Sequence, residues 1–161
     1  MKLKLTACID APKEKIWQIL SDISSIPLWV EPINSAYCEG DKEKGVGAVR
    51  VCHLKGNMEV REKWIQWDEG NSFTYEADET LYFKTAINKW SVMSEKGKTL
   101  LTTESEVILK GGFIGKLFEP LMYFISVKMG MRSMAALQYL AETGHPYKGK
   151  TSKLPKIAIT C

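Results

Sequence analysis

The feature that most restricts the fold is a helical pattern near the end of the chain, over residues 113–143, in which apolar side chains occur on almost every side. Gly144 follows the pattern and is typical of a helix end. Pro120 predicts either a kink or the start of the main helical segment. The apolar stretch 113–127 contains charged residues and is too short to cross a bilayer, which needs about 20 residues. A helix of this kind is buried in the protein or meets a second partner.

The residues before this helix alternate in the manner of β-strands. Residues 2–9 place apolar side chains on one face and polar ones on the other. A helix follows, with Asp10 as its N-cap, and then a second short helical or turn segment over residues 21–33. From residue 34 to 109, about six runs rich in β-branched and aromatic residues alternate with turn clusters at 40–47, 56–57, 68–71 and 95–98. This order predicts an α+β fold in which seven antiparallel strands wrap around helix 113–143.

Composition and charge narrow the function classes. The chain has 161 residues, 45% apolar and 25% charged, as expected of a single globular domain rather than a disordered chain. Residues 144–161 contain four lysines and no acid, so residues 1–143 carry a net charge of −1. We therefore expect a ligand-binding domain over 1–143 and a solvated basic tail over 144–161, which could contact a membrane surface or a protein. A nucleic-acid partner is not expected, because such proteins carry a basic face on the folded part.

The four cysteines predict reduced, buried thiols rather than a metal site. They show no paired CxxC spacing, and Cys52 beside His53 is poor spacing for metal ligands. The sequence has no phosphate-binding, dinucleotide-binding, GxSxG or HExxH motif, so no cofactor or metal is predicted and no catalytic residue is assigned. The chain opens directly into a strand pattern instead of a signal peptide, which favours a cytoplasmic location.

One carboxylate stands out in the strand pattern of residues 57–67. Glu62 shares a face with three apolar residues, and a buried carboxylate must be paired, hydrogen-bonded or protonated. Arg50 is the preferred partner, because a neighbouring strand can bring it opposite, and Arg132 is the second choice. The alternative is an exposed ion pair at the sheet edge, since a bulge at 64–65 would turn Glu62 outward.

Aromatic and methionine side chains are the candidates for an apolar pocket wall. Trp and Tyr combine a flat apolar face with one polar group, which suits ring-shaped or lipid ligands, and Met is an adaptable wall residue. The alternative is an ordinary packed core. The complete set of predicted ligand-binding residues is Trp29, Arg50, Glu62, Trp64, Tyr75, Trp90, Phe118, Met122, Ile125, Met129 and Arg132.

Several segments resemble the helix-grip (SRPBCC) superfamily, which includes START-type lipid carriers, polyketide cyclase/dehydrase-like proteins and birch-pollen-allergen-like proteins. The resemblance covers residues 1–143 and is carried by Ile9–Pro12, Ile16–Leu20, Trp29, Gly45–Gly47, Trp90, Thr99–Thr103 and Leu137–Glu142. It implies a deep apolar cavity between the sheet and the last helix, but no particular reaction.

The main functional hypothesis is binding or transport of a hydrophobic small molecule, such as a lipid or a polyketide-like or isoprenoid-like compound. One alternative is an aromatase/cyclase or dehydratase-type enzyme, for which His53, Tyr82 and Tyr123 would add polar groups to Arg50, Glu62 and Tyr75. The other alternative is an interaction module that uses the last helix and the tail on a membrane or a protein. A monomer and a homodimer are both compatible with the sequence.

Overall fold

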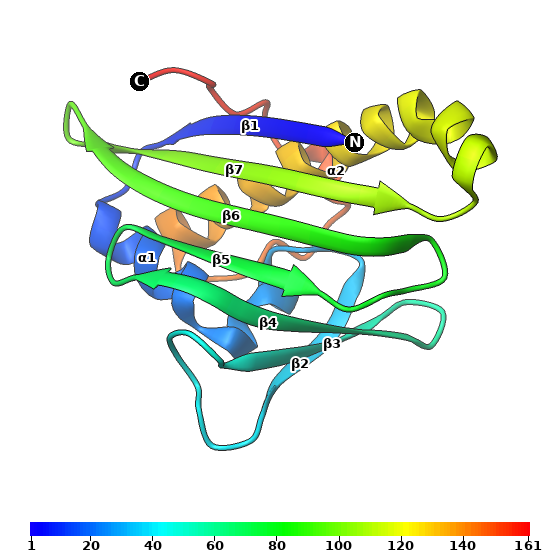
Figure 1. The fold of residues 1–161 in the computed structure, drawn as a ribbon. Helices are drawn as coiled ribbons and strands as arrows, with labels where there is room; N and C mark the ends of the chain where they lie inside the picture. The colour runs from blue at the N-terminus through cyan, green and yellow to red at the C-terminus, as the bar shows by residue number, and fades with distance from the viewer.

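A curved antiparallel sheet wraps around one long helix (Figure 1). The computed structural model describes residues 1–161 apart from the side chain of Ile114. The strands are β1 (Lys2–Ile9), β2 (Ile33–Glu39), β3 (Val49–Leu54), β4 (Met58–Asp68), β5 (Ser72–Ala77), β6 (Phe83–Glu95) and β7 (Lys98–Leu109). The helices are α1 (Lys13–Ser21), the 3-10 helix η1 (Ile23–Leu28), α2 (Gly112–Thr143) and the 3-10 helix η2 (Thr151–Lys153).

The sheet has the strand order β1-β7-β6-β5-β4-β3-β2, with each neighbouring pair antiparallel. Strands β2 to β7 follow one another as hairpins, whereas α1 and η1 carry the chain from β1 at one edge of the sheet to β2 at the other (Figure 1). The predicted α+β arrangement of seven strands and a long C-terminal helix is confirmed.

The core lies between the concave face of the sheet and the C-terminal half of α2. Met134, Leu137 and Ala141 of α2 are fully buried. Gly130 lies where α2 comes closest to β1, since a Cβ atom added there would be 2.4 Å from Cδ1 of Leu5. The helix ends as the sequence predicts, with Gly144 in the left-handed conformation at φ 74°.

The start of α1 differs from the prediction. Asp10 does not cap this helix; Pro12 occupies the N-cap position, and no side chain caps the helix there. The carboxylate of Asp10 instead lies 3.5 Å from Nζ of Lys98, at the turn between β6 and β7. The carbonyl oxygen of Pro12 accepts the first helical hydrogen bond, from the backbone N–H of Ile16 at 3.2 Å.

The C-terminal segment is anchored to the domain at several points, while its four lysines are exposed, as expected of a solvated basic tail. Its residues Leu154 and Ile157 pack against the hydrophobic core. Further on, the backbone N–H of Cys8 donates to the carbonyl oxygen of Ala158 at 2.7 Å. Strand β1 is at the edge of the sheet, and an edge strand offers unpaired backbone groups to a neighbouring segment. In the sequence, the lysines that surround these apolar residues make the segment resemble a solvated tail.

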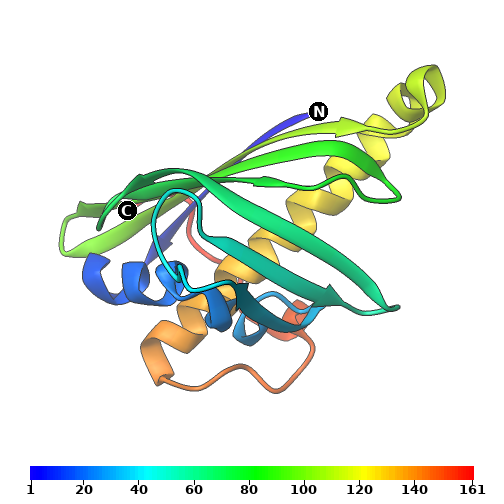
Figure 2. The ribbon, with the colours of Figure 1, turned by 60° about the horizontal axis from the view of Figure 1, so that its bottom comes forward.

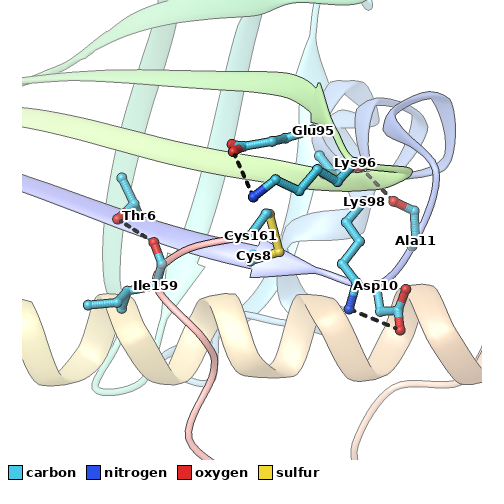
Figure 3. Close-up of a disulfide and its surroundings, with 10 residues drawn as sticks. Thr6, Cys8, Asp10, Ala11, Glu95, Lys96, Lys98, Ile159 and Cys161 are labelled. Atoms are coloured by element: carbon cyan, nitrogen blue, oxygen red, sulfur yellow. Dashed lines mark hydrogen bonds and ion pairs between the residues drawn. A yellow bond between two sulfur atoms is a disulfide. The ribbon is translucent and has the colours of Figure 1, made fainter.

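The same segment ends in a disulfide between Cys8 and Cys161, whose Cα atoms are 5.2 Å apart (Figure 3). Beside it, the hydroxyl of Thr6 donates to the carbonyl oxygen of Ile159 at 3.3 Å. The prediction of four reduced thiols is therefore wrong for this pair, while Cys38 and Cys52 are free. The pairing was not visible in the sequence, because 153 positions separate the two cysteines and only the return of the tail to β1 brings them together.

Candidate ligand-binding site

A cavity of about 320 Å³ lies between the concave face of the sheet and α2. On the helix side, Ser126, Gly130 and Ser133 face it, and these small residues leave space that larger side chains would fill. Its apolar wall consists of Met1, Leu3, Leu5, Ile26, Trp29, Val30, Pro32, Ile33, Leu54, Trp90, Val107 and Met129. Its polar side chains are Glu62, Tyr75, Asn88, Thr103, Ser105, Ser126 and Ser133.

One wall residue, Glu62, belongs to a buried ion pair with Arg50, which lies behind the wall. Strands β3 and β4 are in a register that places Arg50 opposite Glu62. Nε of Arg50 donates to Oε2 of Glu62 at 2.7 Å, and Nη2 lies 2.6 Å from the same oxygen. Arg50 is 2% exposed and Glu62 8% exposed. The predicted pairing is confirmed, and the register shift between Trp64 and Gln66 begins beyond Glu62, so it does not turn the carboxylate outward.

Two aromatic rings hold the arginine in place. The guanidinium carbon of Arg50 lies 5.1 Å from the ring centre of Trp64 and 5.4 Å from that of Tyr75, in cation–π geometry. Trp64 therefore packs behind the ion pair instead of lining the cavity, and its buried Nε1 has no hydrogen-bond partner in the described part of the chain. Burial raises the pKa of Tyr75, and the charge of Glu62 raises it further, so the phenol remains a hydrogen-bond donor.

One oxygen of the Glu62 carboxylate has no partner among the described residues. Both contacts with Arg50 use Oε2, and so does the thiol of Cys52 at 3.6 Å. No described residue donates to Oε1, while the side chain remains 11% exposed and lines the cavity. Burial raises the pKa of Cys52 to about 12, so this sulfur is a neutral thiol and a poor nucleophile at neutral pH.

A second polar group of the wall, Asn88 on β6, is fixed by its neighbour. The hydroxyl of Ser105 donates to Oδ1 of Asn88 at 2.6 Å, which leaves the amide nitrogen of Asn88 free to donate. The cavity therefore offers an acceptor on Glu62 and donors on Tyr75 and Asn88 among mainly apolar surroundings.

Five of the predicted binding residues line this cavity, namely Trp29, Glu62, Tyr75, Trp90 and Met129. The rings of Trp29 and Trp90 meet edge to face, with their centres 5.5 Å apart. Arg50 lies behind the wall with Trp64, whereas Ile125 and Arg132 line a neighbouring surface pocket. Phe118 and Met122 line neither space, and His53, Tyr82 and Tyr123 also lie outside the lining of the cavity.

Phe118 and Met122 lie outside the cavity because the N-terminal part of α2 extends beyond the sheet (Figure 2). The side chains there are exposed to a degree unusual for apolar residues, with Phe113 at 84% and Leu117 at 71%. The expectation that helix 113–143 is buried in the protein is therefore wrong for its first turns. None of the described helices is long and apolar enough to cross a membrane.

Several polar wall residues were not predicted from the sequence. Asn88 has the same strand parity as Trp90, and Ser126 and Ser133 are seven positions apart on one helix face. Both spacings were available in the sequence. They belong to small neutral side chains, which give a weaker signal than apolar or charged ones.

Comparisons with known proteins identify the family. Residues 1–137 match the family of polyketide cyclase / dehydrase and lipid transport proteins, and the chain belongs to this family. No curated protein matches the chain.

Solved structures of distant proteins share the fold. The Zhui aromatase/cyclase from Streptomyces sp. R1128 is 14% identical with a TM-score of 0.74, over 88% of this chain and 93% of that chain. A protein from Thermus thermophilus is 15% identical with a TM-score of 0.74, over 89% of this chain and 99% of that one. The major latex-like protein 151 from Panax ginseng is 15% identical with a TM-score of 0.57, over 79% and 94%. At these identities the similarity shows the helix-grip fold alone.

Proposed function

We propose that this protein binds a single hydrophobic small molecule in the cavity between the sheet and α2. The observation that carries the proposal is the cavity itself, with a mainly apolar wall and a few fixed polar groups, as in small-molecule sites generally. Its volume of about 320 Å³ is at the lower end of the usual range of about 300–1,000 Å³. A compact ring system or a single short acyl chain fits this volume better than a two-chain lipid. Membership of a family that includes lipid transport supports the same function.

The neutral fluorescent probe N-phenyl-1-naphthylamine tests this proposal. Trp29 and Trp90 line the cavity, so a bound probe is expected to quench tryptophan emission by energy transfer. Ser126→Phe places a ring in the cavity and is expected to abolish saturable binding. Ser94→Phe adds the same ring on the exposed part of β6 and serves as the matched control. Equal binding by the two variants, or no binding by the wild type, would contradict the proposal.

A second candidate function is catalysis of the aromatase/cyclase or dehydratase type. It is favoured by Glu62, Tyr75 and Asn88, which place a carboxylate, a protonated phenol and an amide on one cavity wall. General acid–base chemistry needs such groups within hydrogen-bond reach of the substrate. Incubation with a linear poly-β-ketone thioester and analysis of the products by mass spectrometry is the test. Turnover that is lost in Glu62→Gln, with probe binding retained, identifies an enzyme; no turnover in the wild type leaves the carrier function.

We keep a cytoplasmic location as part of the proposal, and the Cys8–Cys161 disulfide makes it testable. Disulfides are rare in the reducing cytoplasm. Protein taken from its own host under acid quench and then treated with N-ethylmaleimide in denaturant is expected to carry four labels if it is cytoplasmic. Two labels and an intact disulfide would contradict this location. The same preparation without the quench, measured by native mass spectrometry, would reveal a co-purifying ligand.

A further inference from the structure

We propose that the ligand is an anionic amphiphile whose acid group binds in a basic pocket at the mouth of the cavity. This inference rests on the proposed function, because it assumes that the apolar part of the ligand occupies the cavity. The pocket, which we call the basic vestibule, has a volume of about 460 Å³ and contains the cationic side chains of Lys55, Lys128 and Arg132. Pro32, Met129 and Ser133 line both the vestibule and the cavity, so the two spaces adjoin.

The three cations reach the vestibule from two elements. Lys128 and Arg132 are one turn apart on α2 and therefore project from the same side of the helix. Lys55 follows β3, and its backbone N–H donates to the carbonyl oxygen of Pro32 at 3.0 Å, which fixes the turn beside the cavity. None of the three makes an ion pair with a carboxylate of the described residues. Three like charges around one pocket repel one another, and a bound anion would reduce this repulsion.

The one carboxylate lining the vestibule within the described residues, Glu31, does not cancel this charge. Its Oε2 accepts a hydrogen bond from the hydroxyl of Thr151, a buried residue of η2. This hydrogen bond lowers the pKa of Glu31, and the charges of Lys55 and Arg132 lower it further, so the carboxylate is ionised at neutral pH. The vestibule consequently carries three positive charges and one negative charge.

The inner wall of the cavity gives the ligand its orientation. There, Glu62 and Arg50 already neutralise each other, so an anion has no free cation to bind at that end. An apolar body gains from burial against Trp29 and Trp90, while its acid group gains from charge-assisted hydrogen bonds at the mouth. The arrangement therefore favours a carboxylate or phosphate attached to one compact apolar body.

Displacement of N-phenyl-1-naphthylamine by dodecanoate and by 1-dodecanol tests this orientation, because the two competitors share a chain length and differ in charge. At low salt, the wild type is expected to bind dodecanoate about tenfold more tightly than dodecanol. In Lys128→Gln/Arg132→Gln this ratio is expected to fall to about one or two. Lys148→Gln/Lys156→Gln removes two exposed lysines outside the vestibule and is expected to keep the wild-type ratio.

The outcomes separate this inference from the proposed function. If the probe binds but acid and alcohol displace it equally in the wild type, the anionic subsite is overturned while the hydrophobic cavity stands. A preference that survives in the double variant overturns the subsite as well. The last experiment compares the affinities of dodecyl phosphate and inorganic phosphate. If the inorganic ion binds as tightly as the alkyl phosphate, the vestibule binds a free anion, and the proposal of an amphiphilic ligand is overturned. If the probe fails to bind at all, both proposals fall.

Discussion

The buried pair of Arg50 and Glu62 yields a quantitative prediction about stability. Glu62→Leu leaves a guanidinium that is 2% exposed without its counter-charge, and Arg50→Met leaves the carboxylate in the same position. Breaking one side of a buried ion pair typically lowers the free energy of unfolding by about 3–5 kcal/mol. Because proteins of this size are stable by only about 5–15 kcal/mol, each single variant is expected to lose a large part of its stability.

The double variant Arg50→Met/Glu62→Leu is the decisive measurement. It removes both charges and refills the space with apolar groups, a change that is often neutral or stabilising. We therefore expect the double variant to be more stable than either single variant. The exposed pair of Lys2 and Glu106, with side chains 79% and 60% exposed, is the matched control. Its coupling energy is expected to be below about 1 kcal/mol.

Urea unfolding followed by tryptophan fluorescence at pH 7 measures all of these variants. Equal slopes of free energy against urea concentration would show that the variants share the same folded and unfolded states. Simple addition of the two single losses in the double variant would refute the reasoning, because it would mean that the pair is not coupled. A stable double variant also has a functional meaning: it would show that the charges are kept for the cavity and not for the fold.

The cysteines and one exposed carboxylate give three further predictions. Cys8→Ser opens the disulfide and is expected to lower the free energy of unfolding by about 2–4 kcal/mol, seen as a lower urea midpoint that reductant no longer changes. Two indole N–H groups, from Trp17 and Trp67, donate to Glu69 and lower its pKa. The ionised Glu69 therefore stabilises the fold fully above its unfolded-state pKa, and this stabilisation is lost as the pH falls through the lower folded-state pKa. In Glu69→Gln, the free energy of unfolding should depend less on pH in the acid range. The thiol of Cys52, with its pKa near 12, should resist dithionitrobenzoate at pH 8 in the folded protein, whereas the less buried Cys38 should react first.

The part of the site that could be predicted from the sequence is the part decided by strand alternation. The alternation in residues 58–64 placed Glu62 on the apolar face, and Arg50 was the preferred partner on a neighbouring strand; the register of β3 and β4 puts the two opposite each other. Trp90 was predicted as an aromatic wall residue, and Asn88 shares its strand parity, so the two side chains reach the same cavity.

The remaining features depend on where whole elements end in space. Helical periodicity places Phe118 and Met129 on the same side of α2, as predicted. Only Met129 lines the cavity, because the helix extends beyond the sheet at Phe118. Periodicity describes the sides of a helix but not the extent of its neighbours. The bond between Cys8 and Cys161 is equally non-local, since it requires the path of the last segment over the edge of β1.

That last segment has a consequence for how the molecule opens. The disulfide closes residues 8–161 into a covalent ring, and residues 1–7, which lie outside it, belong to or precede β1. The ammonium group of Met1 is held as well, since it donates to the carbonyl oxygen of Val107 at 2.8 Å and lies 2.6 Å from Glu119. Fraying normally begins at chain ends, whose amide hydrogens exchange first with solvent. In this protein the amide hydrogens that exchange fastest should be those of loops within the ring, such as residues 40–47. When a reductant opens the disulfide, the amide hydrogens of β1 should exchange fastest instead.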